Sequence, residues 1–202
     1  MDSVLILSPL AVEHAALSGA MGKSLKGVEL AVGGHGKVQF ALSTQLLIQK
    51  YNPRLVICAG AAGRLDHSVK LLDVMVSEAT VEHDFNLRFV DRPLPRFACD
   101  ERSLDRLRRV NDWPFGVHFG IMASGDEDVL DSERGDQIRR LTEARAVAWE
   151  GAGAARACKL HGVPYLEVRV ITDGAAVGAV QEFSENVKKG MVHVADVIRR
   201  LL

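Results

Sequence analysis

The chain has 202 residues, 48% hydrophobic and 25% charged, and its 25 basic and 26 acidic residues give a formal net charge of −1. This composition is typical of a globular protein that buries a full core, and we expect a single domain over 1–202. The balanced charge argues against nucleic-acid binding, and no apolar run reaches the ~20 residues of a membrane span.

The N-terminus and the cysteines predict a cytoplasmic protein. The first 17 residues are apolar but have no basic flank, and they include the acids Asp2 and Glu13, which argues against a signal peptide. The three cysteines are widely spaced and form no CxxC motif. Cys58 and Cys158 lie in apolar or small-residue runs, so we interpret them as reduced thiols of the core.

The N-terminal part alternates strand and helix patterns. An apolar strand at 4–7 precedes a helix at 11–21, whose first turn holds Glu13. An acid there is favoured by the helix dipole, so by itself Glu13 is most simply structural. A strand at 27–32 then runs into a glycine-rich turn and a helix at 38–51. Glycines before a helix allow close approach of a polar ligand, and His35 in this turn either lines such a site or merely occupies the turn.

The middle of the chain continues this alternation. A buried strand at 54–59 ends in Gly60-Ala61-Ala62-Gly63, small residues that leave room for a ligand. A strand at 72–79 precedes Glu82-His83-Asp84, which we interpret as a hydrogen-bonded turn rather than a metal site. The remaining predicted segments are an irregular loop at 88–100, a polar helix at 100–110, a strand at 116–123 and a polar helix at 131–143.

The stretch 144–176 carries the most chemistry. A short strand stops at Glu150, a small-residue helix follows, and a buried strand at 163–172 contains Arg169 and ends at Asp173. A packing helix at 183–202 completes the chain. Seven strands alternating with helices predict an α/β three-layer sandwich with a central mixed, largely parallel sheet. The candidate residues cluster where strands end, which is where such sheets bind ligands.

These segments resemble the nucleoside phosphorylase and nucleosidase superfamily, and within it the 5′-methylthioadenosine/S-adenosylhomocysteine nucleosidases. The resemblance runs in order from about residue 3 to the C-terminus. It is carried by the strand around Ile6 with Glu13, and by GGHGKVQFA at 33–41, VICAGAAGRLD at 56–66, VSEATVEHD at 76–84, MASGDEDVL at 122–130, AVAWEGAGAARAC at 146–158 and VPYLEVRVITDGA at 163–175.

The resemblance implies cleavage of the N-glycosidic bond of a purine ribonucleoside, without cofactor or metal, by a homodimer. Asp173 matches the acid that protonates the leaving purine, a role that needs a pKa raised by burial. Glu13 matches the acid that activates the attacking water, and Arg169 the arginine near that water. Glu150 matches the carboxylate that binds the ribose hydroxyls of an oxocarbenium-like transition state.

Further substrate-binding residues follow from the same resemblance, some of them as departures from the family pattern. Trp149 replaces a methionine under the ribose, and Asp128 replaces the aromatic residue that stacks on the base. Val129 keeps backbone contacts to the base edge. His35 replaces an aliphatic residue near the 5′ substituent, and Thr172 precedes the acid. The stretch from His83 to Asp100 is also shorter than in typical members.

Several alternatives stay open at this point. Ala61 replaces a family serine and the glycine-rich segment lacks an arginine, which favours water over phosphate as the nucleophile. The other hypotheses are a futalosine-type hydrolase, a phosphate-dependent phosphorylase of the same fold, and a nucleoside-binding module without turnover.

Overall fold

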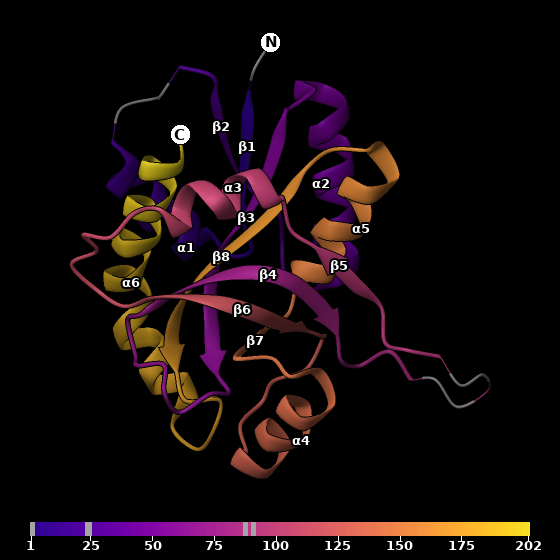
Figure 1. Ribbon diagram of the computed structural model, residues 1–202, viewed down its shortest axis with the longest axis vertical. Helices are drawn as coiled ribbons and strands as arrows, with labels where there is room; N and C mark the ends of the chain where they lie inside the picture. The colour runs from indigo at the N-terminus through magenta and orange to yellow at the C-terminus, as the bar shows by residue number, and fades with distance from the viewer. Residues whose placement is uncertain (1–2, 23–25, 87–88, 90–91) are drawn as a thin grey trace.

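The computed structural model describes residues 3–22, 26–86, 89 and 92–202, and these form a mixed sheet with helices on both faces (Figure 1). The strands are β1 (Val4–Ser8), β2 (Val28–Val32), β3 (Leu55–Arg64), β4 (Val74–Glu82), β5 (Arg96–Ala98), β6 (Val117–Ser124), β7 (Ala146–Ala148) and β8 (Tyr165–Asp173). The helices are α1 (Ala11–Met21), α2 (Lys37–Tyr51), α3 (Glu101–Arg108), α4 (Ser132–Thr142), α5 (Gly151–His161) and α6 (Ala179–Leu201).

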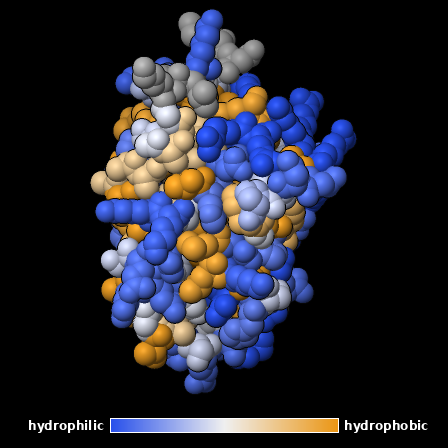
Figure 2. Space-filling view, turned by 90° about the vertical axis from the view of Figure 1, so that its left-hand side faces the viewer, coloured by the Kyte–Doolittle hydropathy of each residue, from blue (hydrophilic) through white to orange (hydrophobic). Residues whose placement is uncertain are grey.

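The predicted fold class is confirmed. Five of the strand pairings are parallel and three are antiparallel. Helices α1 and α6 pack together on one face of the sheet, and α2 and α5 pack together on the other (Figure 1). Figure 2 shows the side that carries α6, where hydrophilic residues predominate and hydrophobic ones form separate spots.

Five strands form a closed series of pairings around the place where the pocket described below lies. β3 pairs with β8, β8 with β4, β4 with β6, β6 with β7, and β7 returns to β3. The return is made near the carboxyl end of β3, where Gly63 lies opposite Val147. The residues that follow β7 and those at the end of β8 are therefore brought to the same end of β3.

The core explains why the strands read as apolar runs. β1 is buried along its whole length, because β2 and β3 cover its edges and α1 and α2 cover its two faces. Cys58, Cys99 and Cys158 are free and buried, as expected of core thiols. None of the helices in the described ranges combines the length and apolar character of a membrane span.

Two element predictions were wrong in part. The loop predicted at 88–100 contains β5, a three-residue edge strand that pairs antiparallel with β4. Its pairing partner is distant in sequence and two prolines precede it, so local pattern did not reveal it. Residues 88, 90 and 91 of that loop lie outside the described ranges. The strand predicted at 54–59 continues to Arg64, because its small residues pair with β8.

The other boundaries shift by a few residues. β4 begins at Val74, not at 72, and extends to Glu82, and α6 begins at Ala179, four residues before the predicted start. The turn predicted at Glu82-His83-Asp84 is confirmed, since the Lys37 ammonium donates to both acids and Arg156 also pairs with Glu82. Among the described residues no cluster of three or more metal-ligating side chains is found.

Candidate active site

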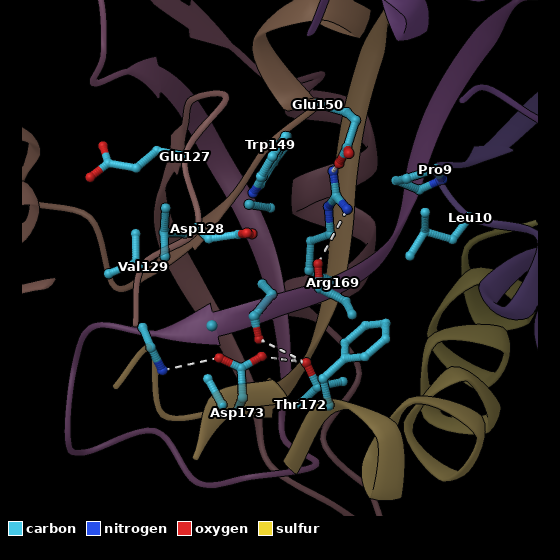
Figure 3. Close-up of a pocket in the computed structure, with 18 of the residues that line it drawn as sticks. Pro9, Leu10, Glu127, Asp128, Val129, Trp149, Glu150, Arg169, Thr172 and Asp173 are labelled. Carbon is cyan, nitrogen blue, oxygen red and sulfur yellow. Dashed lines mark hydrogen bonds and ion pairs between the residues drawn. The ribbon is translucent and has the colours of Figure 1, made fainter. Parts of the chain in front are cut away.

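A pocket of about 270 Å³ opens where β3, β7 and β8 meet, between the loop after β1 and the loop after β6 (Figure 3). Its volume is near the lower end of the ~300–1,000 Å³ typical of small-molecule sites. The pocket brings together all ten residues selected from the sequence. They are Glu13, His35, Ala61, Asp128, Val129, Trp149, Glu150, Arg169, Thr172 and Asp173.

Glu13 is a buried acid that reaches from α1 to β3. Its side chain is 2% exposed, and its Oε1 accepts a hydrogen bond from the Ala61 amide at 2.7 Å. Its Oε2 accepts from the Leu10 amide at 2.8 Å, so Glu13 also satisfies a free backbone donor at the start of α1. Burial raises the pKa of Glu13 to about 7, against the lowering effect of Arg169 and the two amides.

Arg169 lies among the acids rather than facing the pocket freely. It is 1% exposed; its Nη2 is 3.2 Å from Glu150 Oε2, and its Nη1 donates to the Ala61 carbonyl at 3.2 Å. Gly60 makes this arrangement possible. A Cβ there would lie 2.7 Å from Glu13 Oε1 and 2.8 Å from Arg169 Nη1, so a larger residue would displace one of the two.

Glu150 links the glycine-rich turn to the site. It is 3% exposed, and its Oε1 accepts from the Gly36 amide at 3.3 Å and lies 3.3 Å from His35 Nδ1. The His35 ring packs against the Trp149 ring, with centroids 4.1 Å apart and planes tilted by 31°. His35 therefore lines the pocket and is not a mere turn residue. Its ring and that of Trp149 form a platform beside the Glu150 carboxylate.

Asp173 is held at the end of β8, on the side of the pocket away from Glu150 (Figure 3). Its Oδ2 accepts from the Thr172 hydroxyl at 2.8 Å, and its Oδ1 accepts from the Ala175 amide at 3.0 Å. Burial raises the pKa of Asp173 despite these two donors. A Cβ at Gly63 would lie 2.9 Å from Asp173 Oδ1, so this glycine leaves the space that the carboxyl occupies.

The loop after β6 supplies Asp128 and Val129. Val129 is 7% exposed, whereas Asp128 is exposed and its carboxylate points into the pocket near Trp149 (Figure 3). Asp126 fixes the loop, because its Oδ1 accepts from the Lys37 amide at 2.7 Å and its own amide donates to Asp84 Oδ2 at 2.9 Å. The turn after β4 thus orients a wall of the pocket.

The sequence reading missed two groups around the site. Ser124 at the end of β6 donates to the Trp149 carbonyl at 2.6 Å and accepts from the Ala152 amide at 2.9 Å, which fixes the turn that holds Glu150. Tyr165 and Glu167 precede Arg169 at alternate positions of β8 and form a buried polar row with it. Three polar side chains spaced by two in an apolar strand were a signal that could have revealed this row.

Acidic residues predominate in the lining of the pocket. Five carboxyl groups line it, from Glu13, Glu127, Asp128, Glu150 and Asp173, whereas the basic lining residues are Arg169 and His35. Arg169 is already bound by neighbouring acids. The pocket can therefore supply proton donors, proton acceptors and hydroxyl-binding carboxylates. Among the described residues that line it, no arginine or lysine is free for an anionic ligand.

The fold and the site together define an α/β protein with a small-molecule pocket equipped for acid–base chemistry. The chain belongs to the phosphorylase superfamily, whose family model matches residues 8–202. It is 30% identical over 189 residues to the 5′-methylthioadenosine/S-adenosylhomocysteine nucleosidase of Staphylococcus haemolyticus, an alignment that covers 88% of this chain and 83% of the relative.

Solved structures agree with this assignment. The 5′-methylthioadenosine/S-adenosylhomocysteine nucleosidase of Neisseria meningitidis, in complex with methylthio-immucillin-A, superposes with a TM-score of 0.92 at 26% identity and covers 100% of this chain and 98% of its own. The futalosine hydrolase of Helicobacter pylori superposes with a TM-score of 0.90 at 26% identity, covering 99% of this chain and 97% of its own.

Proposed function

We propose that this protein hydrolyses the N-glycosidic bond of a 5′-modified purine ribonucleoside, of the methylthioadenosine or adenosylhomocysteine type, and releases the free base. The observation that carries the proposal is a pair of carboxyl groups, buried Glu13 and half-buried Asp173, that line one pocket with raised pKa values. A neutral acid can protonate a leaving purine, and an ionised acid can accept a proton from water. The names of the relatives support the same chemistry.

The residues divide this work between them. Asp173 donates the proton that neutralises the departing purine. Glu150 accepts hydrogen bonds from the ribose hydroxyls, which strengthen as positive charge develops on the sugar. Glu13 orients and deprotonates the attacking water, and Arg169 holds Glu150 next to it. Trp149, with the His35 ring packed against it, contacts the sugar and the 5′ substituent, and Val129 and Asp128 lie beside the base.

Water is the proposed nucleophile because the pocket repels phosphate. A phosphate site needs free arginine or other donors, whereas here Arg169 is bound to Glu150 and Glu167. The acids that line the pocket, of which the proposed mechanism uses only Asp173 in its neutral form, add an unfavourable field for a dianion.

The test is an assay of free base from methylthioadenosine, adenosylhomocysteine, inosine and futalosine, each with and without phosphate. We expect release without phosphate, fastest from one of the 5′-thio nucleosides. Release from futalosine alone would assign the second candidate, which the similarity to the Helicobacter pylori hydrolase supports. Release that requires phosphate would identify a phosphorylase, and binding without release a non-catalytic module.

We also propose that the protein is a cytoplasmic homodimer that pairs through α2. The helix exposes Val38, Leu42 and Leu46, spaced four residues apart, with 72%, 55% and 65% of each residue accessible. A row of this kind on one helix face is typical of a surface that another chain covers. The cytoplasmic location is supported by the three cysteines of the protein, which are free and buried as expected in a reducing compartment.

Leu42→Glu should convert this dimer to monomer. Burying a charge in place of leucine on both copies costs at least the two lost leucine burials, roughly 3 kcal/mol, or on the order of 100-fold in the dimer dissociation constant. Sedimentation equilibrium measures the change. Val192→Glu, at a half-exposed position of α6 on the other face of the sheet, is the control and should leave the dimer intact. A wild-type protein that sediments as a monomer would contradict the pairing.

A further inference from the structure

Glu167 is a buried acid directly behind the active site that the chemistry above does not use. It lies on β8, is 1% exposed, and is not among the residues that line the pocket. A buried carboxylate is costly unless hydrogen bonds and an opposite charge compensate for its lost hydration. Its contacts therefore indicate why the fold retains it.

Three donors converge on this carboxylate. Arg169 Nε donates to Oε1 at 3.0 Å, the Thr80 hydroxyl donates to Oε2 at 2.6 Å, and the Tyr165 hydroxyl lies 3.0 Å from Oε2. The Tyr165 proton can alternatively reach the Gly151 carbonyl at 3.1 Å. Gly151 also leaves the space for Glu167, because a Cβ there would collide with the carboxylate. Three donors facing one group fit the ionised form.

Glu167 holds the guanidinium of Arg169 on the side away from the pocket. The groups around that guanidinium come from four elements: Glu13 from α1, Cys58 and the Ala61 carbonyl from β3, Glu150 at the start of α5, and Glu167 from β8. Of the three carboxylates, Glu13 and Glu150 line the pocket, where the proposed function gives each a separate task. Glu167 is the one left to balance the arginine.

We propose that Glu167 is a positioning residue for the hydrolysis: it fixes Arg169 through Nε and balances its charge, so that Glu150 stays aligned for ribose and Glu13 stays available to water. Because a guanidinium is planar, holding Nε orients Nη1 and Nη2 as well. The inference rests on the proposed function for its catalytic meaning. The placement of the three acids around Arg169 does not depend on the substrate.

Glu167→Gln is the first test, since the amide keeps the size and one acceptor but removes the charge. A small displacement of catalytic groups costs up to about 100-fold, so we expect kcat/KM to fall on the order of 10- to 100-fold. Arg169 would then act on Glu13 without its counter-charge, so the acid limb of the pH profile of kcat/KM should move to lower pH. Glu185→Gln makes the same change at an exposed site and should change neither kcat/KM nor the position of the acid limb.

Two further variants separate positioning from packing. Tyr165→Phe removes one hydroxyl from the same buried row but no charge, so it should lower stability and leave the acid limb in place. Glu167→Gln combined with Arg169→Gln should be no less active than Arg169→Gln alone, because residues that act as one unit are not additive. The double variant should also be more stable than Arg169→Gln, which leaves Glu167 buried without its counter-charge.

A measurement without substrate keeps this inference separate from the proposed function. Carbon-13 labelling of the glutamate carboxyl groups allows Glu13 to be titrated by NMR, and its pKa should be lower in Glu167→Gln than in the wild type. An unchanged Glu13 titration, an unmoved acid limb, or additive losses in the double variant would each overturn the positioning role. A protein that releases no base but still shows the lower Glu13 pKa in Glu167→Gln would contradict the proposed function and leave the placement of Arg169 by Glu167 intact.

Discussion

Asp173→Asn should lower kcat by 10²- to 10⁴-fold, the usual contribution of a general acid, while KM changes little. Asparagine is nearly the same size and keeps an oxygen for the Ala175 amide. Its amide group can donate to the Thr172 hydroxyl, which now donates to Asp173. The pocket therefore keeps its shape but loses the proton that the departing purine needs. Steady-state assay of base release measures the change.

The pH dependence of wild-type activity should also reveal the role of Asp173 as a general acid. A general acid must be protonated, and burial raises the pKa of Asp173, so wild-type activity should fall as pH rises through that pKa. Asp136→Asn, at an exposed position of α4, is the matched control and should leave kcat and the profile unchanged. An Asp173→Asn variant with wild-type kcat would show that another group protonates the base.

Glu13→Gln should abolish most of the hydrolysis, with a loss of 10²- to 10⁴-fold in kcat/KM, because an amide cannot accept a proton from water. The pKa of Glu13 is about 7, so only its ionised fraction can act as base near neutral pH. Wild-type kcat/KM should accordingly have a limb that rises with pH through about 7, set by the ionisation of Glu13. The variant should lack the rising limb.

Glu13→Gln should lower activity but raise stability, relative to the wild type, as the pH increases. Folding raises the pKa of Glu13 from 4.5 to about 7, so its protonated form is the more stable in the fold, and this contribution is lost as pH rises through that interval. A shift of this size corresponds to roughly 3 kcal/mol. The free energy of unfolding of the wild type should therefore fall by about this amount, relative to that of Glu13→Gln, between pH 4.5 and pH 7.5.

Urea unfolding at several pH values measures this difference. The amide also leaves one of the Leu10 and Ala61 donors without an acceptor, a cost of roughly 1–3 kcal/mol that is the same at every pH. The pH slope isolates the carboxyl from that constant cost. A difference that does not vary with pH would mean that Glu13 ionises in the fold as readily as in the unfolded chain.

Local patterns in the chain were enough for most of the fold. Apolar runs and helical spacing located seven of the eight strands and all six helices, because each such segment carries its own period of burial. They failed for β5, whose three residues gain their conformation from pairing with β4, and for the end of β3, where glycine and alanine resemble a turn. In both places the partner strand, not the local sequence, supplies the hydrogen bonds.

The resemblance of ordered motifs to a known family selected the ten pocket residues, but their environments come from the folded molecule. From the sequence, Glu13 is interpreted as a helix-dipole acid. In the fold, the Ala61 amide and Gly60 of β3 enclose its carboxyl group, and burial raises its pKa. The alternation of Tyr165, Glu167 and Arg169 signals a polar row in β8, but only the fold brings Thr80 of β4 to Glu167. Sequence thus identifies which groups can carry a charge, whereas only the packed structure decides whether water or protein surrounds that charge.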